Sequence, residues 1–129
     1  MKELVLDASA LIAMLRKEPG GEAVADVLAG ARMSVVNFAE VVRRFTHAGV
    51  PQAELREMFA TIRLSLVDAD AELAWSAGRL RGTTAEAGLS LGDRFCLALG
   101  ARDRLPVWTA DRQWRTIADK LDVEIVLIR

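Results

Sequence analysis

The stretch "ELVLDASALIAML", residues 3–15, places one acidic residue between two apolar segments. Residues 3–6 form a short apolar run, which is typical of a strand buried within a sheet. Residues 8–17 follow with apolar side chains at helical spacing, so a helix is expected there. Asp7 stands at the junction. The stretch therefore predicts a strand that ends at a carboxylate and leads directly into a helix.

The rest of the chain repeats this alternation of strand and helix. Further strands are expected at 32–36, 65–70, 105–111 and 123–128. Further helices are expected at 22–30, from 34 or 37 to the break at 48–51, and at 52–64, 71–81, 89–102 and 112–121, with a loop at 82–88. Strands that alternate with helices predict an α/β fold, a parallel sheet covered by helices on both faces. In such sheets, sites lie just beyond the carboxyl ends of strands.

Length and composition predict one globular domain over residues 1–129. The chain is 52% hydrophobic and carries a net charge of −1, which argues against a general nucleic-acid binder with a broad basic surface. No apolar run approaches the ~18 residues of a membrane span. The single cysteine, Cys96, excludes an internal disulfide and is expected in the core. These features together indicate a soluble, cytoplasmic protein with no membrane partner.

Four acidic residues fall where a parallel sheet would bring them together. Asp7 and Asp111 directly follow expected strands. Glu40 lies one or two turns into the helix after 32–36, and Asp93 lies in the first turn of its helix. All four are therefore expected at one edge of the sheet.

Each of these residues also has an ordinary structural interpretation. Asp7 and Asp111 can cap the helices that follow them. Asp93 can complete a capping box with the serine three residues before it. Glu40 can pair with Arg44 at i,i+4. Taken singly, the structural interpretation is favoured for Glu40 and is evenly balanced for the others.

Taken together, the four carboxylates favour a divalent metal ion. Clustered carboxylates repel one another, and burying them unpaired is costly. Carboxylate ligands favour Mg²⁺ or Mn²⁺. Zinc and a Ser-His-Asp triad are poorly supported, since His47 is the only histidine, and "GG" at 20–21 lacks the context of a phosphate-binding loop. Carboxylates with such an ion and no organic cofactor indicate phosphodiester hydrolysis.

Four motifs then resemble a known family. They are "LVLDASALIAML" (4–15), "SVVNFAEVVRR" (34–44), "GLSLGDRFCLALGAR" (88–102) and "VWTADRQW" (107–114). In this order and over nearly the whole chain, they resemble the PIN-domain ribonucleases, and most of all the VapC-type toxins of VapBC toxin–antitoxin systems. "DASAL" alone is weak evidence, whereas the four motifs together are highly specific.

The resemblance implies a single PIN domain folded as an α/β/α sandwich. It implies an endoribonuclease that needs Mg²⁺ or Mn²⁺ and cleaves an RNA substrate. It also implies a cognate VapB-type antitoxin that blocks the site, commonly in a complex built on a homodimer.

The resemblance also assigns roles to residues of this chain. Asp7 and Asp93 would be the main direct metal ligands. Glu40 and Asp111 would bind through water, hold a second ion or activate the attacking water. The supporting hydroxyl positions are those of Ser9 and Thr109.

Three arginines and two helices are further candidates. Arg94, Arg112 and Arg115 flank the acidic positions and could contact RNA phosphates, although solvated or salt-bridged arginines are equally expected there. The helices at 8–17 and 52–64 carry enough apolar residues to serve both the core and a groove for an antitoxin helix.

Other functions remain open at this stage. A PIN-type nuclease could act on DNA or in RNA maturation, outside a toxin–antitoxin pair. A non-enzymatic, Mg²⁺-binding receiver-like domain would need two acids after the first strand and a late lysine, but Lys120 lies inside an expected helix. A haloacid-dehalogenase-type phosphatase would need an aspartate where Ser9 stands.

Overall fold

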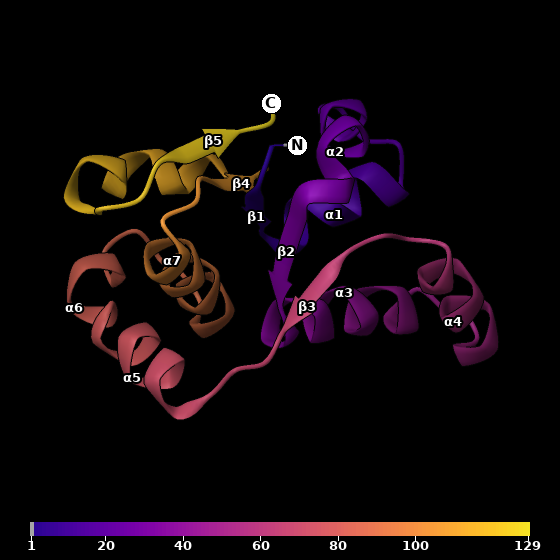
Figure 1. Ribbon diagram of the computed structural model, residues 1–129, viewed down its shortest axis with the longest axis horizontal. Coiled ribbons are helices and arrows are strands. Elements are labelled where there is room, and N and C mark those ends of the chain that lie inside the picture. The colour runs from indigo at the N-terminus through magenta and orange to yellow at the C-terminus, as the bar shows by residue number, and fades with distance from the viewer. Residues whose placement is uncertain (1) are drawn as a thin grey trace.

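A computed structural model describes residues 2–129, and it contains one five-stranded sheet in which every strand pair is parallel. The strand order is β3-β2-β1-β4-β5, so the first strand lies in the centre of the sheet (Figure 1). The strands are β1 (Leu4–Leu6), β2 (Ala31–Ser34), β3 (Ser65–Val67), β4 (Val107–Thr109) and β5 (Ile125–Leu127). The predicted parallel α/β sheet is confirmed.

Helices connect the strands and cover both faces of the sheet. They are α1 (Ala8–Leu15), α2 (Gly21–Val27), η1 (Leu28–Gly30), α3 (Val35–His47), α4 (Gln52–Ala60), α5 (Ala71–Arg79), α6 (Arg81–Thr84), α7 (Leu91–Asp103) and η2 (Arg112–Lys120). Figure 1 shows α5, α6 and α7 gathered on one side of β1 and β2, with α3 and α4 on the other.

Two hydrophobic cores form because successive side chains of a strand point to opposite faces of the sheet. In β1, Val5 packs into a core with residues of α5, α7 and η2, whereas Leu4 and Leu6 pack into a second core with residues of α1 and α2. In β4, Val107 joins the first core and Trp108 joins the second. The central strands are thus buried on both faces, which explains their continuous apolar runs.

The structure corrects one expectation and refines another. The segment 82–88 is not all loop, because α6 reaches Thr84, whose hydroxyl donates to the Leu80 carbonyl at 2.8 Å. The helix expected at 112–121 is present as a 3₁₀ helix, η2. Leu91, the first residue of α7, is 55% exposed. Within residues 2–129, no helix combines the length and apolarity that crossing a membrane requires.

Candidate metal centre

The order of the strands places a candidate site between β1 and β4. The connections that leave these two neighbouring parallel strands lead to opposite sides of the sheet. From β1 the chain moves to β2 on one side, while β4 pairs with the other side of β1. Such a switch point leaves a crevice at the carboxyl ends of the two strands. Asp7 follows β1 there, and its backbone N–H donates to the Trp108 carbonyl of β4 at 2.9 Å. Asp111 lies two residues beyond the end of β4.

Asp7 occupies the N-cap position of α1, yet its side chain caps nothing. Its Oδ2 atom instead accepts hydrogen bonds from the Ser9 hydroxyl at 2.6 Å and the Thr109 hydroxyl at 2.9 Å. The residue is only 4% exposed. The simple capping interpretation of Asp7 is therefore wrong, because neighbouring side chains rather than the helix N-terminus fix the carboxylate.

Ser9 and Thr109 connect the two strand ends as well as holding Asp7. Their hydroxyl oxygens lie 3.1 Å apart. The Ser9 hydroxyl also accepts from the Ala110 N–H at 2.9 Å, and the Thr109 hydroxyl accepts from the Asp111 N–H at 3.1 Å. This network holds the segment after β1 against the segment after β4.

Asp93 and Asp111 both act as helix caps. Asp93 forms the expected capping box, in which its Oδ2 accepts from the Ser90 N–H at 2.9 Å and the Ser90 hydroxyl accepts from the Asp93 N–H at 3.2 Å. Asp111 Oδ1 accepts from the Gln113 N–H at 2.9 Å. A carboxylate has two oxygens with several acceptor positions, so these caps leave each residue with capacity to bind an ion.

Glu40 is positioned by a buried amide that the sequence interpretation missed. Asn37, which is fully buried, donates from Nδ2 to Glu40 Oε1 at 3.2 Å and to the Gly92 carbonyl at 2.9 Å. Gly92 also leaves the space that Glu40 occupies, because a Cβ on it would collide with that carboxylate. Among residues 2–129, no ion pair joins Glu40 to Arg44. The expected i,i+4 pair is therefore not formed.

All four predicted acidic residues line one cavity of about 160 Å³. Its walls come from β1 and α1, from α3, from the first turn of α7 and from the turn after β4. The complete lining is Asp7, Ala8, Ser9, Ile12, Glu40, Arg43, Arg44, Asp93 and Asp111. Four carboxylates from four separate chain segments thus face one small space.

Burial and mutual repulsion raise the pKa values of three of these carboxyl groups. Burial is the main cause at each of them. It raises the pKa of Asp7 from 3.8 to about 6, against the opposing hydrogen bonds from Ser9 and Thr109. The pKa of Glu40 rises from 4.5 to about 7, with repulsion from Asp7 and Asp93 adding to burial. The pKa of Asp93 is raised as well. Excess negative charge at this cavity is therefore unfavourable without a cation.

The residues fit a hard divalent cation in charge and in donor chemistry. The available donors are carboxylate oxygens, which Mg²⁺ and Mn²⁺ prefer. As the side chains stand, no group of three or more Asp, Glu, His or Cys residues within 2–129 is arranged to hold an ion. One oxygen each of Asp93 and Glu40 accepts a hydrogen bond from a donor of the protein. An ion in this cavity would require these carboxylates to move closer together.

The arginines near the site differ from expectation. Arg94 donates to the Thr84 hydroxyl at 3.1 Å and to the Leu89 carbonyl at 3.0 Å, so its guanidinium connects α7 to α6 and to the loop between them. Arg112 and Arg115 are exposed on η2 and do not line the cavity. The cavity is lined instead by Arg43 and Arg44 of α3, which the sequence analysis did not single out as substrate contacts. Their spacing of three and four residues from Glu40 is the sequence signal that could have placed them beside Glu40 on one face of the helix.

The family model of the PIN domain matches residues 4–120. The chain therefore belongs to the PIN domain family, as the four motifs indicated. A search of curated proteins found no match to this sequence.

Solved structures with the same fold include several toxin–antitoxin complexes. The chain is 26% identical to a chain of VapBC-5 from Mycobacterium tuberculosis, described as a member of the VapBC family of toxin–antitoxin systems. Their TM-score is 0.67, and the match covers 98% of this chain and 99% of that one. DNA-bound VapBC from Salmonella typhimurium matches over 100% of both chains, with 19% identity and a TM-score of 0.75. FitAcB from Neisseria gonorrhoeae matches over 97% of both, with 19% identity and a TM-score of 0.72.

Proposed function

We propose that this protein is a metal-dependent endoribonuclease and the toxin of a type II toxin–antitoxin system. It hydrolyses RNA phosphodiester bonds with Mg²⁺ or Mn²⁺ held by the carboxylate cavity. The observation that carries the proposal is the convergence of Asp7, Glu40, Asp93 and Asp111 on that cavity in a chain of the PIN domain family.

The resemblance to the PIN-domain ribonucleases supports the following roles for the four acidic residues. Asp7 and Asp93 are the principal metal ligands, and Glu40 and Asp111 hold water or a second ion. When bound, the metal lowers the pKa of a water molecule and stabilises the leaving oxygen. Ser9 and Thr109 keep the Asp7 carboxylate in one orientation. Glu40 lines the same cavity and can accept a proton from the attacking water.

A cognate VapB-type antitoxin is the proposed partner, in a complex built on a toxin homodimer in the cytoplasm. Its support is the likeness to VapBC-5, which belongs to a toxin–antitoxin family, and to other complexes of that kind. The apolar cavity of about 540 Å³ between α3 and α4, lined in part by Phe38, Leu55 and Phe59, offers a surface for an antitoxin helix.

The test of function is RNA cleavage by the antitoxin-free protein with Mg²⁺, Mn²⁺ or a chelator. Total RNA, purified tRNAs and ribosomal RNA serve as substrates. Asp93→Asn keeps an acceptor for the Ser90 N–H while removing the charge, so it should fold but not cleave. Asp119→Asn, an exposed site on η2, is the matched control and should cleave normally.

Metal-dependent cuts that disappear in Asp93→Asn and persist in Asp119→Asn would support the nuclease. Full activity in a folded Asp93→Asn protein would overturn it. A PIN nuclease that acts on DNA or in RNA maturation is the alternative within the family. Cleavage of DNA but not RNA, or the lack of an adjacent antitoxin gene, would favour that alternative.

A further inference from the structure

We propose that Arg43 and Arg44 of α3 hold a phosphate of the RNA strand at the carboxylate cavity. The inference rests on the proposed function, because it assigns the substrate contact of the same site. Both residues lie about one helical turn beyond Glu40, and residues three and four apart share a helix face. Both line the cavity that contains the four carboxylates.

Their guanidinium groups are available to an incoming anion. Both residues are exposed, and among the side chains of residues 2–129 neither has a carboxylate within 4 Å. Some other arginines of the chain are already engaged. Arg32, for example, binds Glu3 at 2.7 Å and Asp103 at 3.0 Å. Arg43 and Arg44 therefore keep the planar fork of donors that matches a phosphate.

The charge of the cavity explains why such a contact is needed. A phosphodiester that approaches four carboxylates is repelled unless positive charge accompanies it. A bound metal offsets part of this repulsion. Of the residues that line the cavity within the described part of the chain, Arg43 and Arg44 are the only cations. The chain as a whole carries a net charge of −1, which offers no overall positive charge to attract RNA.

Arg43 and Arg44 are also better placed for this phosphate contact than the arginines that the sequence suggested. The Arg94 guanidinium is committed to Thr84 and Leu89. Arg112 is exposed and does not line the cavity. An RNA strand held by Arg43 and Arg44 would cross the cavity from the α3 wall toward the first turn of α7. Its reacting phosphate would then lie over the carboxylates.

The experiment measures binding separately from cleavage. Fluorescence anisotropy of a short, labelled, single-stranded RNA is recorded across about 50 to 200 mM salt, the range in which phosphate contacts change affinity strongly. Calcium replaces magnesium in one series, and a chelator is present in another. Each phosphate contact contributes about 0.7 to the slope of log affinity against log salt for a single strand. Because the two arginines hold one phosphate, Arg43→Gln/Arg44→Gln should lower that slope by about 0.7.

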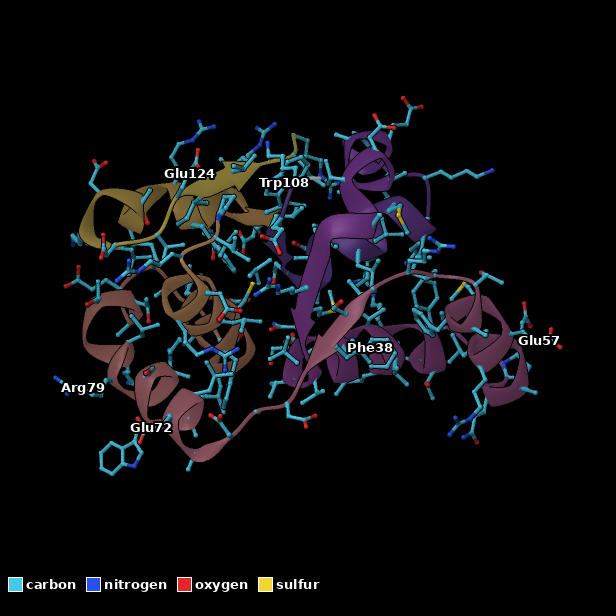
Figure 2. The ribbon with its side chains drawn as sticks, in the orientation of Figure 1. Phe38, Glu57, Glu72, Arg79, Trp108 and Glu124 are labelled. Carbon is cyan, nitrogen blue, oxygen red and sulfur yellow. The ribbon has the colours of Figure 1, made fainter. Side chains whose placement is uncertain are left out.

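The control removes two exposed arginines elsewhere. Arg79→Gln/Arg81→Gln changes the net charge equally, and Figure 2 shows Arg79 pointing outward from α5, at the opposite side of the view from Glu57 of α4. Its slope should match the wild type. Arg43→Lys/Arg44→Lys should keep the slope, because the charge remains, but bind several-fold more weakly, because the fork is lost.

Four outcomes would overturn the inference: an unchanged slope in the Gln variant, an equal loss in the control, a lower slope in the Lys variant, or no salt-dependent RNA binding by the wild type. The failure of the proposed function looks different. If the Gln variant shows the expected change in slope but the wild type cleaves no RNA with Mg²⁺ or Mn²⁺, the nuclease proposal is refuted and the phosphate contact is retained.

Discussion

Replacing Asp7 with asparagine should stabilise the metal-free protein at neutral pH. The wild-type carboxyl group is 4% exposed, and burial raises its pKa from 3.8 to about 6. One pKa unit corresponds to about 1.4 kcal/mol, so ionised Asp7 costs about 3 kcal/mol of folding free energy. Asparagine never ionises, and its carbonyl can still accept the hydroxyls of Ser9 and Thr109.

The pH dependence follows from the sign of the shift. Between 3.8 and about 6, the native protein binds more protons at Asp7 than the unfolded chain does, so the free energy of unfolding falls as the pH rises. The contribution of neutral Asp7 is fully present below 3.8 and is lost as the pH rises through about 6. Asp7→Asn should therefore match the wild type near about pH 4 and exceed it by about 3 kcal/mol above about pH 7.

Urea unfolding with a chelator, followed by the fluorescence of buried Trp108 and Trp114, measures this difference. The slope of free energy against urea must stay constant for the comparison to hold. Asp119→Asn, at an exposed site, should change stability by less than about 0.5 kcal/mol. An Asp7→Asn protein that is no more stable than the wild type at about pH 8 would refute the idea that a costly charge is buried at this site.

Three other perturbations test the same site. Mg²⁺ at about 100 times its dissociation constant should stabilise the wild type by about 2.7 kcal/mol in thermal unfolding. This stabilisation should weaken as the pH falls through about 7 and 6, because protons compete with the ion for Glu40 and Asp7. Equal stabilisation of Asp7→Asn by Mg²⁺ would contradict the prediction. Gly92→Ala should abolish RNA cleavage, because its Cβ displaces the Glu40 carboxylate. The control Gly78→Ala, where a Cβ meets nothing within 4 Å, should keep activity and raise the free energy of unfolding in urea by about 0.5–1 kcal/mol. Normal cleavage by Gly92→Ala would show that the position of Glu40 is dispensable. Ser9→Ala should lower stability by about 1–3 kcal/mol, since it leaves a backbone N–H without its acceptor, and a neutral effect would mean that water replaces the hydroxyl.

Much of the fold is encoded locally and could be predicted. The run at 3–6 is wholly apolar apart from its first residue, and it becomes the central strand, buried on both faces. Capping signals were equally readable, as the box formed by Ser90 and Asp93 shows. The strand order was not predicted, because it depends on which connection crosses to which side of β1 rather than on any local pattern.

The sequence indicated the four acidic residues that line the cavity and the hydroxyls of Ser9 and Thr109 that hold Asp7, but it did not indicate the contacts that position Glu40. The carboxylates at 7 and 111 follow strands, and the carboxyl ends of parallel strands meet at one edge of the sheet. Asn37 and Gly92 were missed because their roles depend on the approach of α3 to α7, which are 55 residues apart at that contact. The role of Arg94 was similarly hidden, since its partner Thr84 lies in a short helix that the sequence presented as a loop.

The most direct test of the central claim is to locate the metal by anomalous scattering from a crystal grown with Mn²⁺. A metal centre at this cavity predicts an anomalous peak between the carboxylates of Asp7 and Asp93, with the Glu40 and Asp111 side chains turned toward it. The same peak should be absent in Asp93→Asn crystals. A peak elsewhere on the protein, or an empty cavity at an Mn²⁺ concentration that supports RNA cleavage, would contradict the claim.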